Sequence, residues 1–224
     1  MARERRYYGL LGVLFWGAMV MLAALVADCL YVMWPYPQGA LGVEPFHARV
    51  NEEWGNLVRL CGTRLVPLSQ AIHHGLHTVL FRWPGFDFMI ARAGDPTPLD
   101  SGGEMMRKAV SQTRPLWGTA LVGLQLFSAR LGVIVLEAPL LLLVSSAALA
   151  DGMVGWYRRR SGSGRESGFV YHRAKRHAGH AVVLLAFAYL VPPAFVDPRM
   201  VITAAAIVLA VTIRIAAAHF KKFI

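Results

Sequence analysis

The apolar residues of this 224-residue chain gather in long continuous runs, not at the alternating or helical spacing of a soluble domain. Four runs stand out, at residues 10–32, 118–150, 181–196 and 201–218. A helix of about 20 apolar residues crosses the hydrocarbon core of a bilayer. The pattern therefore predicts an all-α, polytopic membrane protein with four transmembrane helices. The polar stretch between the first and second runs predicts a helical periplasmic insertion.

The runs divide the chain into five parts. These are an N-terminal transmembrane anchor (1–34), a helical periplasmic subdomain (35–118), a second transmembrane helix with a periplasmic extension (119–150), a basic cytoplasmic loop (151–180) and a transmembrane hairpin with a basic tail (181–224). The first run exceeds the roughly 7–15 apolar residues of a signal peptide, which favours an uncleaved anchor. The second run exceeds one crossing, so we expect the crossing to lie between Leu131 and Asp151, bent at Pro139.

The insertion has a helical pattern of its own. Apolar side chains recur three or four positions apart over residues 46–82, which predicts an amphipathic helix. Pro67 lies inside this stretch and should kink or split the helix. Glycine, proline and aspartate are concentrated in residues 92–103, and this composition predicts a loop.

Composition and charge support the membrane class and set an orientation. Hydrophobic residues make up 56% of the chain and charged residues 16%, against roughly 25% charged residues in a soluble domain. The net charge is +10, and basic residues cluster at the N-terminus, in the loop 151–180 and at the C-terminus. Because basic segments remain on the cytoplasmic side of a bacterial inner membrane, we expect both termini and this loop to face the cytoplasm.

The basic loop and the C-terminal tail offer a surface for an acidic partner. The candidate contact residues are Arg158, Arg159, Arg160, Arg165, Glu166, Tyr171, His172, Arg173, Lys175, Arg176, Lys221 and Lys222. Anionic lipid headgroups attract such residues by roughly 1 kcal/mol per cation near the surface. Arginine and lysine also bind the phosphates of nucleic acid. Attraction to lipid and anchoring at the membrane interface explain the basic and aromatic residues without any contact with DNA. We therefore favour lipid or protein contact over direct DNA contact.

Five charged residues lie within or at the ends of apolar runs, where charge is rare and usually paired. They are Asp28, Arg130, Glu137, Asp151 and Arg214. Their depths predict an outer cluster of Asp28 with Arg130, to which Glu137 is a possible addition, and an inner pair of Asp151 with Arg214. Two separate levels of charge favour a structural role over a proton or ion path through the midplane.

Candidate chemistry is sparse. The sequence has no nucleophile beside a base and none of the common catalytic motifs, so we expect a protein that is not an enzyme and holds no cofactor or metal. His73, His74 and His77 have a helical spacing that suits a metal, but a fourth ligand is missing unless Asp87 folds back. Cys29 and Cys61 both fall on the outer side, and the sequence leaves open whether they form a disulfide.

Two segments of the C-terminal half resemble a known family. They are the stretch that begins Asp151-Gly152-Met153-Val154 and continues through the arginine run to residues 164–176 (GRESGFVYHRAKR), and the ending FKKFI at residues 220–224. They are similar to membrane proteins encoded in integrating conjugative elements beside the type IV coupling protein. The resemblance covers most of residues 120–224.

The resemblance implies a bacterial inner-membrane component of a conjugative type IV secretion system. Its implied partners are the coupling protein, which is the ATPase that brings DNA to the channel, other conjugation membrane proteins and the surrounding lipids. It supplies no catalytic residues. The alternatives are a small transporter or lipid-interacting protein that uses the intramembrane charges, and a DNA-gripping accessory protein whose binding falls with salt.

Overall fold

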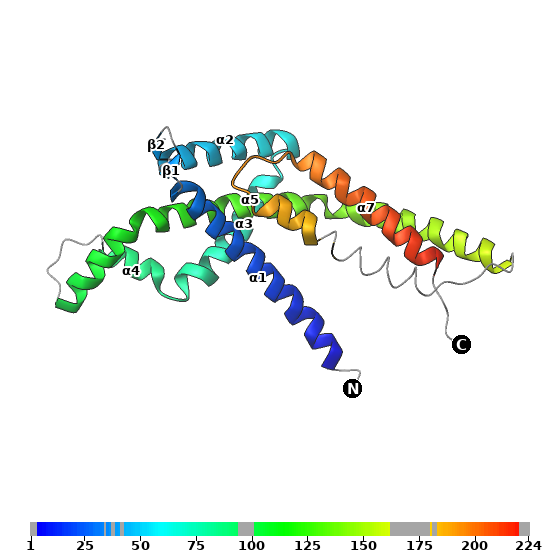
Figure 1. The fold of residues 1–224 in the computed structure, drawn as a ribbon, viewed down its shortest axis with the longest axis horizontal. Helices are drawn as coiled ribbons and strands as arrows, with labels where there is room; N and C mark the ends of the chain where they lie inside the picture. The colour runs from blue at the N-terminus through cyan, green and yellow to red at the C-terminus, as the bar shows by residue number, and fades with distance from the viewer. Residues whose placement is uncertain are drawn as a thin grey trace. The chain divides into compact units, whose positions relative to one another are not determined.

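The computed structural model describes residues 4–33, 35–36, 39–40, 43–93, 101–161, 180 and 183–219 of the chain. Its elements in chain order are α1 (Glu4–Met33), β1 (Pro35–Tyr36), β2 (Gly39–Ala40), α2 (Val43–Cys61), α3 (Leu65–His77), the π-helix η1 (Thr78–Arg82), α4 (Phe86–Ala93), α5 (Ser101–Ser161) and α7 (Pro198–Ala218) (Figure 1). Residues 183–190 are also helical. The predicted all-α class is therefore confirmed, with one addition: a two-residue antiparallel ladder, in which Pro35 pairs with Ala40, follows α1.

Three of the described helices are long and apolar enough to cross a membrane. They are Phe15–Met33 of α1, Gly103–Ser161 of α5 and Pro198–Ala218, the whole of α7. The fourth predicted crossing, residues 181–196, is not among them. Its described helix ends at residue 190, and an irregular segment with Pro192 and Pro193 follows. Proline has no amide hydrogen to donate, so this segment cannot continue the helix regularly. The four-span topology stays a prediction.

Helix α5 is a single helix of 61 residues. At 1.5 Å per residue it is about 90 Å long, roughly three times the thickness of a hydrocarbon core. It runs without interruption through Pro139 and through the boundaries that we drew at residues 118 and 150. The segments that we predicted as a periplasmic extension, a second crossing and the start of a basic loop are thus parts of one helix.

The chain between α1 and α5 divides at a glycine and not at the predicted proline. Gly62 has a φ of +80°, a conformation that favours glycine, and its amide donates to the carbonyl of Val58 at 2.9 Å. Pro67 is the third residue of α3. An amide hydrogen at this position has no acceptor within the helix, so proline is tolerated there. The stretch is split, as expected, but the break lies at residues 62–64 and not at Pro67. The predicted loop at 92–103 is helical at both edges, and residues 94–100 lie outside the described part of the chain.

The structure forms two compact units. One contains residues 1–133 and 190–195, and the other contains residues 134–189 and 196–224. In the first unit α2 packs along α5 through two buried apolar clusters. The first cluster is Val32, Phe46, Val50 and Leu126, and the second is Leu57, Leu65, Ala129 and Val133. The amphipathic pattern of residues 46–82 thus finds its partner surface on α5.

In the second unit α5 and α7 approach each other closely at Gly152. A Cβ atom at this position would lie 2.6 Å from the Cβ of Ala217 and 2.8 Å from the carbonyl oxygen of Arg214. A Cβ atom at Gly155 would lie 3.6 Å from the Cβ of Ala218. Later residues of α5 thus meet later residues of α7, so the two helices run in the same direction. Glycine permits this contact because it has no side chain.

We predict that Gly152→Ala destabilises the protein, whereas Gly155→Ala does not. Both changes raise the helix propensity of α5 equally, but only the first adds an atom where the space is already occupied. Overpacking of this kind typically costs about 1–3 kcal/mol. The measurement is the free energy of unfolding of the purified protein in detergent. Equal stability of the two variants would contradict the close approach.

Candidate functional site

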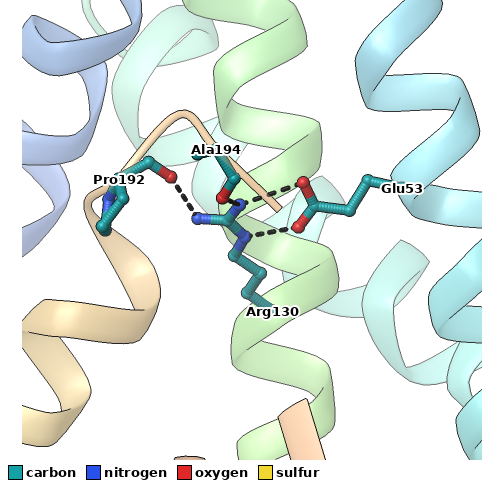
Figure 2. Close-up of polar contacts among 4 residues, drawn as sticks. All are labelled: Glu53, Arg130, Pro192 and Ala194. Atoms are coloured by element: carbon teal, nitrogen blue, oxygen red, sulfur yellow. Dashed lines mark hydrogen bonds and ion pairs between the residues drawn. The ribbon is translucent and has the colours of Figure 1, made fainter. Parts of the chain in front are cut away.

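The most buried charged group in the described chain is the guanidinium of Arg130 on α5, whose side chain is 1% exposed. Figure 2 shows how it lies between α2 and the irregular segment after residue 190. Its Nε donates to Oε1 of Glu53 at 2.7 Å and its Nη2 to Oε2 at 3.0 Å. Its Nη1 donates to the carbonyl of Pro192 at 2.6 Å, and its Nη2 also donates to the carbonyl of Ala194 at 2.9 Å.

Each partner of Arg130 is supplied by a local feature of the sequence. Glu53 lies three residues after Val50 and four before Leu57, so it shares the buried face of α2. Pro192 and Ala194 lie in the segment where the helix of residues 183–190 has ended, and their carbonyls therefore need other donors. The guanidinium donates two parallel hydrogen bonds to the carboxylate of Glu53 and one further hydrogen bond to each of the two carbonyls. The arrangement ties α2, α5 and this segment together.

Asp28 on α1 belongs to the same region, although the ion-pair partner of Arg130 is Glu53. Its side chain is 3% exposed and lies directly against Gly123 of α5, where a Cβ atom would meet the carboxylate. It is close enough to interact electrostatically with both Arg130 and Glu53. Our predicted outer cluster is corrected in this respect: Glu53 had not been included. Glu137 lies seven residues beyond Arg130 on α5, is partly buried, and forms no ion pair with any described residue.

Asp151 and Arg214 are brought together by the structure. Nε of Arg214 forms an ion pair with Oδ2 of Asp151, next to the close approach at Gly152. Both side chains are more than half exposed. The pair joins α5 to α7 at the end of the apolar part of each helix.

Arg158, Arg159 and Arg160 form the last turn of α5. Arg158 and Arg160 are exposed, and Arg160 lies over the ring of Trp156 with its Cζ 5.4 Å from the ring centroid. The other candidate contact residues lie outside the described part of the chain: Arg165, Glu166, Tyr171, His172, Arg173, Lys175, Arg176, Lys221 and Lys222. The structure therefore defines the beginning of the basic surface as a helix end.

The histidine group lies on α3. Asp87 does fold back, and its Oδ1 is 3.4 Å from Nε2 of His77. The ring of His77 stacks on the ring of Phe81, with 5.4 Å between the two centroids. The ring centroid of His73 lies 5.9 Å from that of His77. Burial, together with the neighbouring His77, lowers the pKa of His73, so that this imidazole is neutral near pH 7.

Two questions that the sequence left open concern metal binding by the histidines and a disulfide between the two cysteines. In the part of the chain that the structure describes, no three side chains of metal-binding type come together. Cys29 on α1 and Cys61 at the end of α2 are both partly buried, and no disulfide joins them within the described residues.

Comparison with known proteins adds one finding. Residues 68–221 match the model of a family described as "IncC plasmid conjugative DNA transfer protein DtrJ-like". The matched region begins in α3 and extends beyond α7, so it includes Arg130, Asp151, Arg214 and the arginines at the end of α5. No curated protein and no solved structure matches the chain.

We predict that Glu53→Gln destabilises the protein by about 3–5 kcal/mol, the usual cost of removing one partner of a buried ion pair. Glu52→Gln is the matched control, because it makes the same change at an exposed position of the same helix. The free energy of unfolding in detergent measures both. If the two variants unfold alike, the bond between Glu53 and Arg130 does not hold the unit together.

Proposed function

Since the chain belongs to the DtrJ-like family of IncC plasmid conjugative DNA transfer proteins, we propose that it acts as a non-enzymatic inner-membrane partner, or scaffold, of the coupling ATPase. The family match supports the role in conjugative DNA transfer. The three apolar helices support a place in a membrane. We further propose that this membrane is the bacterial inner membrane, that both termini face the cytoplasm, and that the partner is the coupling ATPase.

The charges of α5 support the proposed orientation. Arg130 and Asp151 are 21 positions apart, which is about 30 Å along a helix and equals the thickness of a hydrocarbon core. Glu137 is the only charged residue between them in the sequence. Three arginines follow Asp151, and the positive-inside rule places such a turn in the cytoplasm. The Arg130 end of the crossing then faces the periplasm.

The helix end after Asp151 is the observation that carries the docking proposal. Tyr157, Arg158 and Arg160 are exposed there, on a helix that Arg214 and the contact at Gly152 fix to α7. Cations held on a firm element suit a partner with an acidic surface at the membrane. The resemblance of the chain to proteins encoded beside the coupling protein favours that ATPase as the partner. The ion pairs of Glu53 with Arg130 and of Asp151 with Arg214 tie helices together, which is the basis for proposing a scaffold and not an enzyme.

We predict that Arg158→Gln combined with Arg160→Gln lowers both co-purification of the coupling ATPase and the frequency of DNA transfer by at least tenfold. The matched control combines Lys108→Gln with Arg114→Gln, which removes two exposed cations from the other end of the same helix. Membrane levels of each variant are measured by immunoblot. Unchanged co-purification and transfer at normal membrane levels would refute the proposed docking surface.

We predict that the two ends of α5 lie on opposite sides of the membrane. In a protein whose Cys29 and Cys61 are replaced by serine, Ser111→Cys and Ser161→Cys place one thiol near each end of the helix. A membrane-impermeant maleimide applied to spheroplasts should label the thiol at position 111 at once and the thiol at 161 only after lysis. The reverse pattern would invert the proposed orientation.

A further inference from the structure

The last two turns of α5 contain two buried N–H donors that have no hydrogen-bond acceptor among the described residues. They are Nε1 of Trp156 and Nη2 of Arg159. A buried donor without an acceptor costs about 1–3 kcal/mol, and native proteins rarely leave two of them close together. The two residues are three positions apart, so they lie on neighbouring turns of one helix face.

The side chain of Arg159 is directed back along α5, toward the N-terminus of the helix. Its Nε donates to the carbonyl of Gly155, one turn earlier, at 3.4 Å. This fold-back agrees with the tilt of helical side chains toward the N-terminus of their helix. The guanidinium is thereby brought to the level of Trp156. The exposed Arg160, whose guanidinium lies over the ring of Trp156, adds a second cation at the same level.

The depth of this group is that of lipid headgroups. If the crossing ends at Asp151, Trp156 lies five residues, or about 7 Å, beyond the hydrocarbon core. The headgroup layer occupies about 5–8 Å on each side of that core. Met153, Val154 and Tyr157 are exposed around the same turns and offer apolar contact to acyl chains. Asp151 is already paired with Arg214, so its carboxylate is not directed at the cations of the last turn.

From this geometry we propose that Trp156, Arg159 and Arg160 form a binding site for the phosphate group of an anionic phospholipid. Because both donors are covered by neighbouring atoms, binding requires those atoms to move aside. The phosphate oxygens then accept from the indole N–H and from the guanidinium of Arg159, and they gain charge attraction from Arg160. This lipid site is additional to the proposed docking of the ATPase. It predicts one defined binding position, in contrast to the diffuse attraction that any basic loop has for an anionic membrane.

The experiment uses the full-length protein in a neutral detergent. Short-chain phosphatidylglycerol is titrated against it, phosphatidylcholine serves as the uncharged comparison, and native mass spectrometry counts the bound lipid. We expect one phosphatidylglycerol to bind, and Trp156→Phe to weaken its binding about tenfold by removing one hydrogen bond to a charged group. Arg159→Gln should weaken it at least as much.

Two control variants on the same helix make the test specific. Trp117→Phe also replaces an indole, but the Nε1 of Trp117 already donates to Oγ1 of Thr113 at 2.9 Å. Arg114→Gln removes one exposed arginine elsewhere on α5. Both should bind the lipid as the unchanged protein does. If all four variants bind phosphatidylglycerol equally, attraction is diffuse and the site does not exist.

Competition separates the lipid from other sources of phosphate. Inorganic phosphate at millimolar concentration and a single-stranded oligonucleotide should both leave the bound lipid in place. Displacement by inorganic phosphate would show a site for a free anion, and displacement by the oligonucleotide would show a nucleic-acid site. Either result overturns the lipid proposal. Trp156→Phe keeps every charge of the helix end, so loss of lipid binding in this variant with intact ATPase co-purification separates this site from the proposed docking surface.

Discussion

A buried guanidinium has to be surrounded by acceptors, and this requirement organises the first compact unit. Moving a cation out of water costs several kcal/mol even after the protein relaxes, so Arg130 is tolerated only with Glu53 and the two carbonyls in place. These acceptors come from α2 and from the segment after residue 190. One side chain of α5 therefore determines where two distant parts of the chain must lie.

Helix α5 gives the second unit its framework in a different way. Near the C-terminal end of α5 the contact with α7 combines an exposed ion pair, Asp151 with Arg214, and a glycine that lets the backbones approach. Exposed ion pairs contribute little by themselves in water, whereas close packing does not depend on salt. Gly152 thus gives the contact its specificity, and the ion pair adds a second tie between the two helices.

The sequence predicted the class of the fold well, because runs of apolar residues have few structural solutions. Depth within the apolar runs was enough to suggest that Asp151 and Arg214 lie at one level, which is where the structure brings them together. The pairing of Glu53 with Arg130 could not be predicted from depth, because Glu53 lies in the insertion and not in an apolar run, 77 positions before its partner. A signal was present all the same: it is an acid on the apolar face of α2. The break at Gly62 was missed because proline received more weight than a positive φ, which no sequence pattern displays directly.

The acceptors of Arg130 also bear on how the protein is made. Glu53 is synthesised early, whereas Pro192 and Ala194 are synthesised only after α5 is complete. During synthesis the guanidinium therefore has only the Glu53 carboxylate as a partner from this cluster until residues 192–194 have been made. The cluster in Figure 2 is consequently completed only late in synthesis: a chain truncated before residue 192 lacks two of the three groups that accept hydrogen bonds from Arg130.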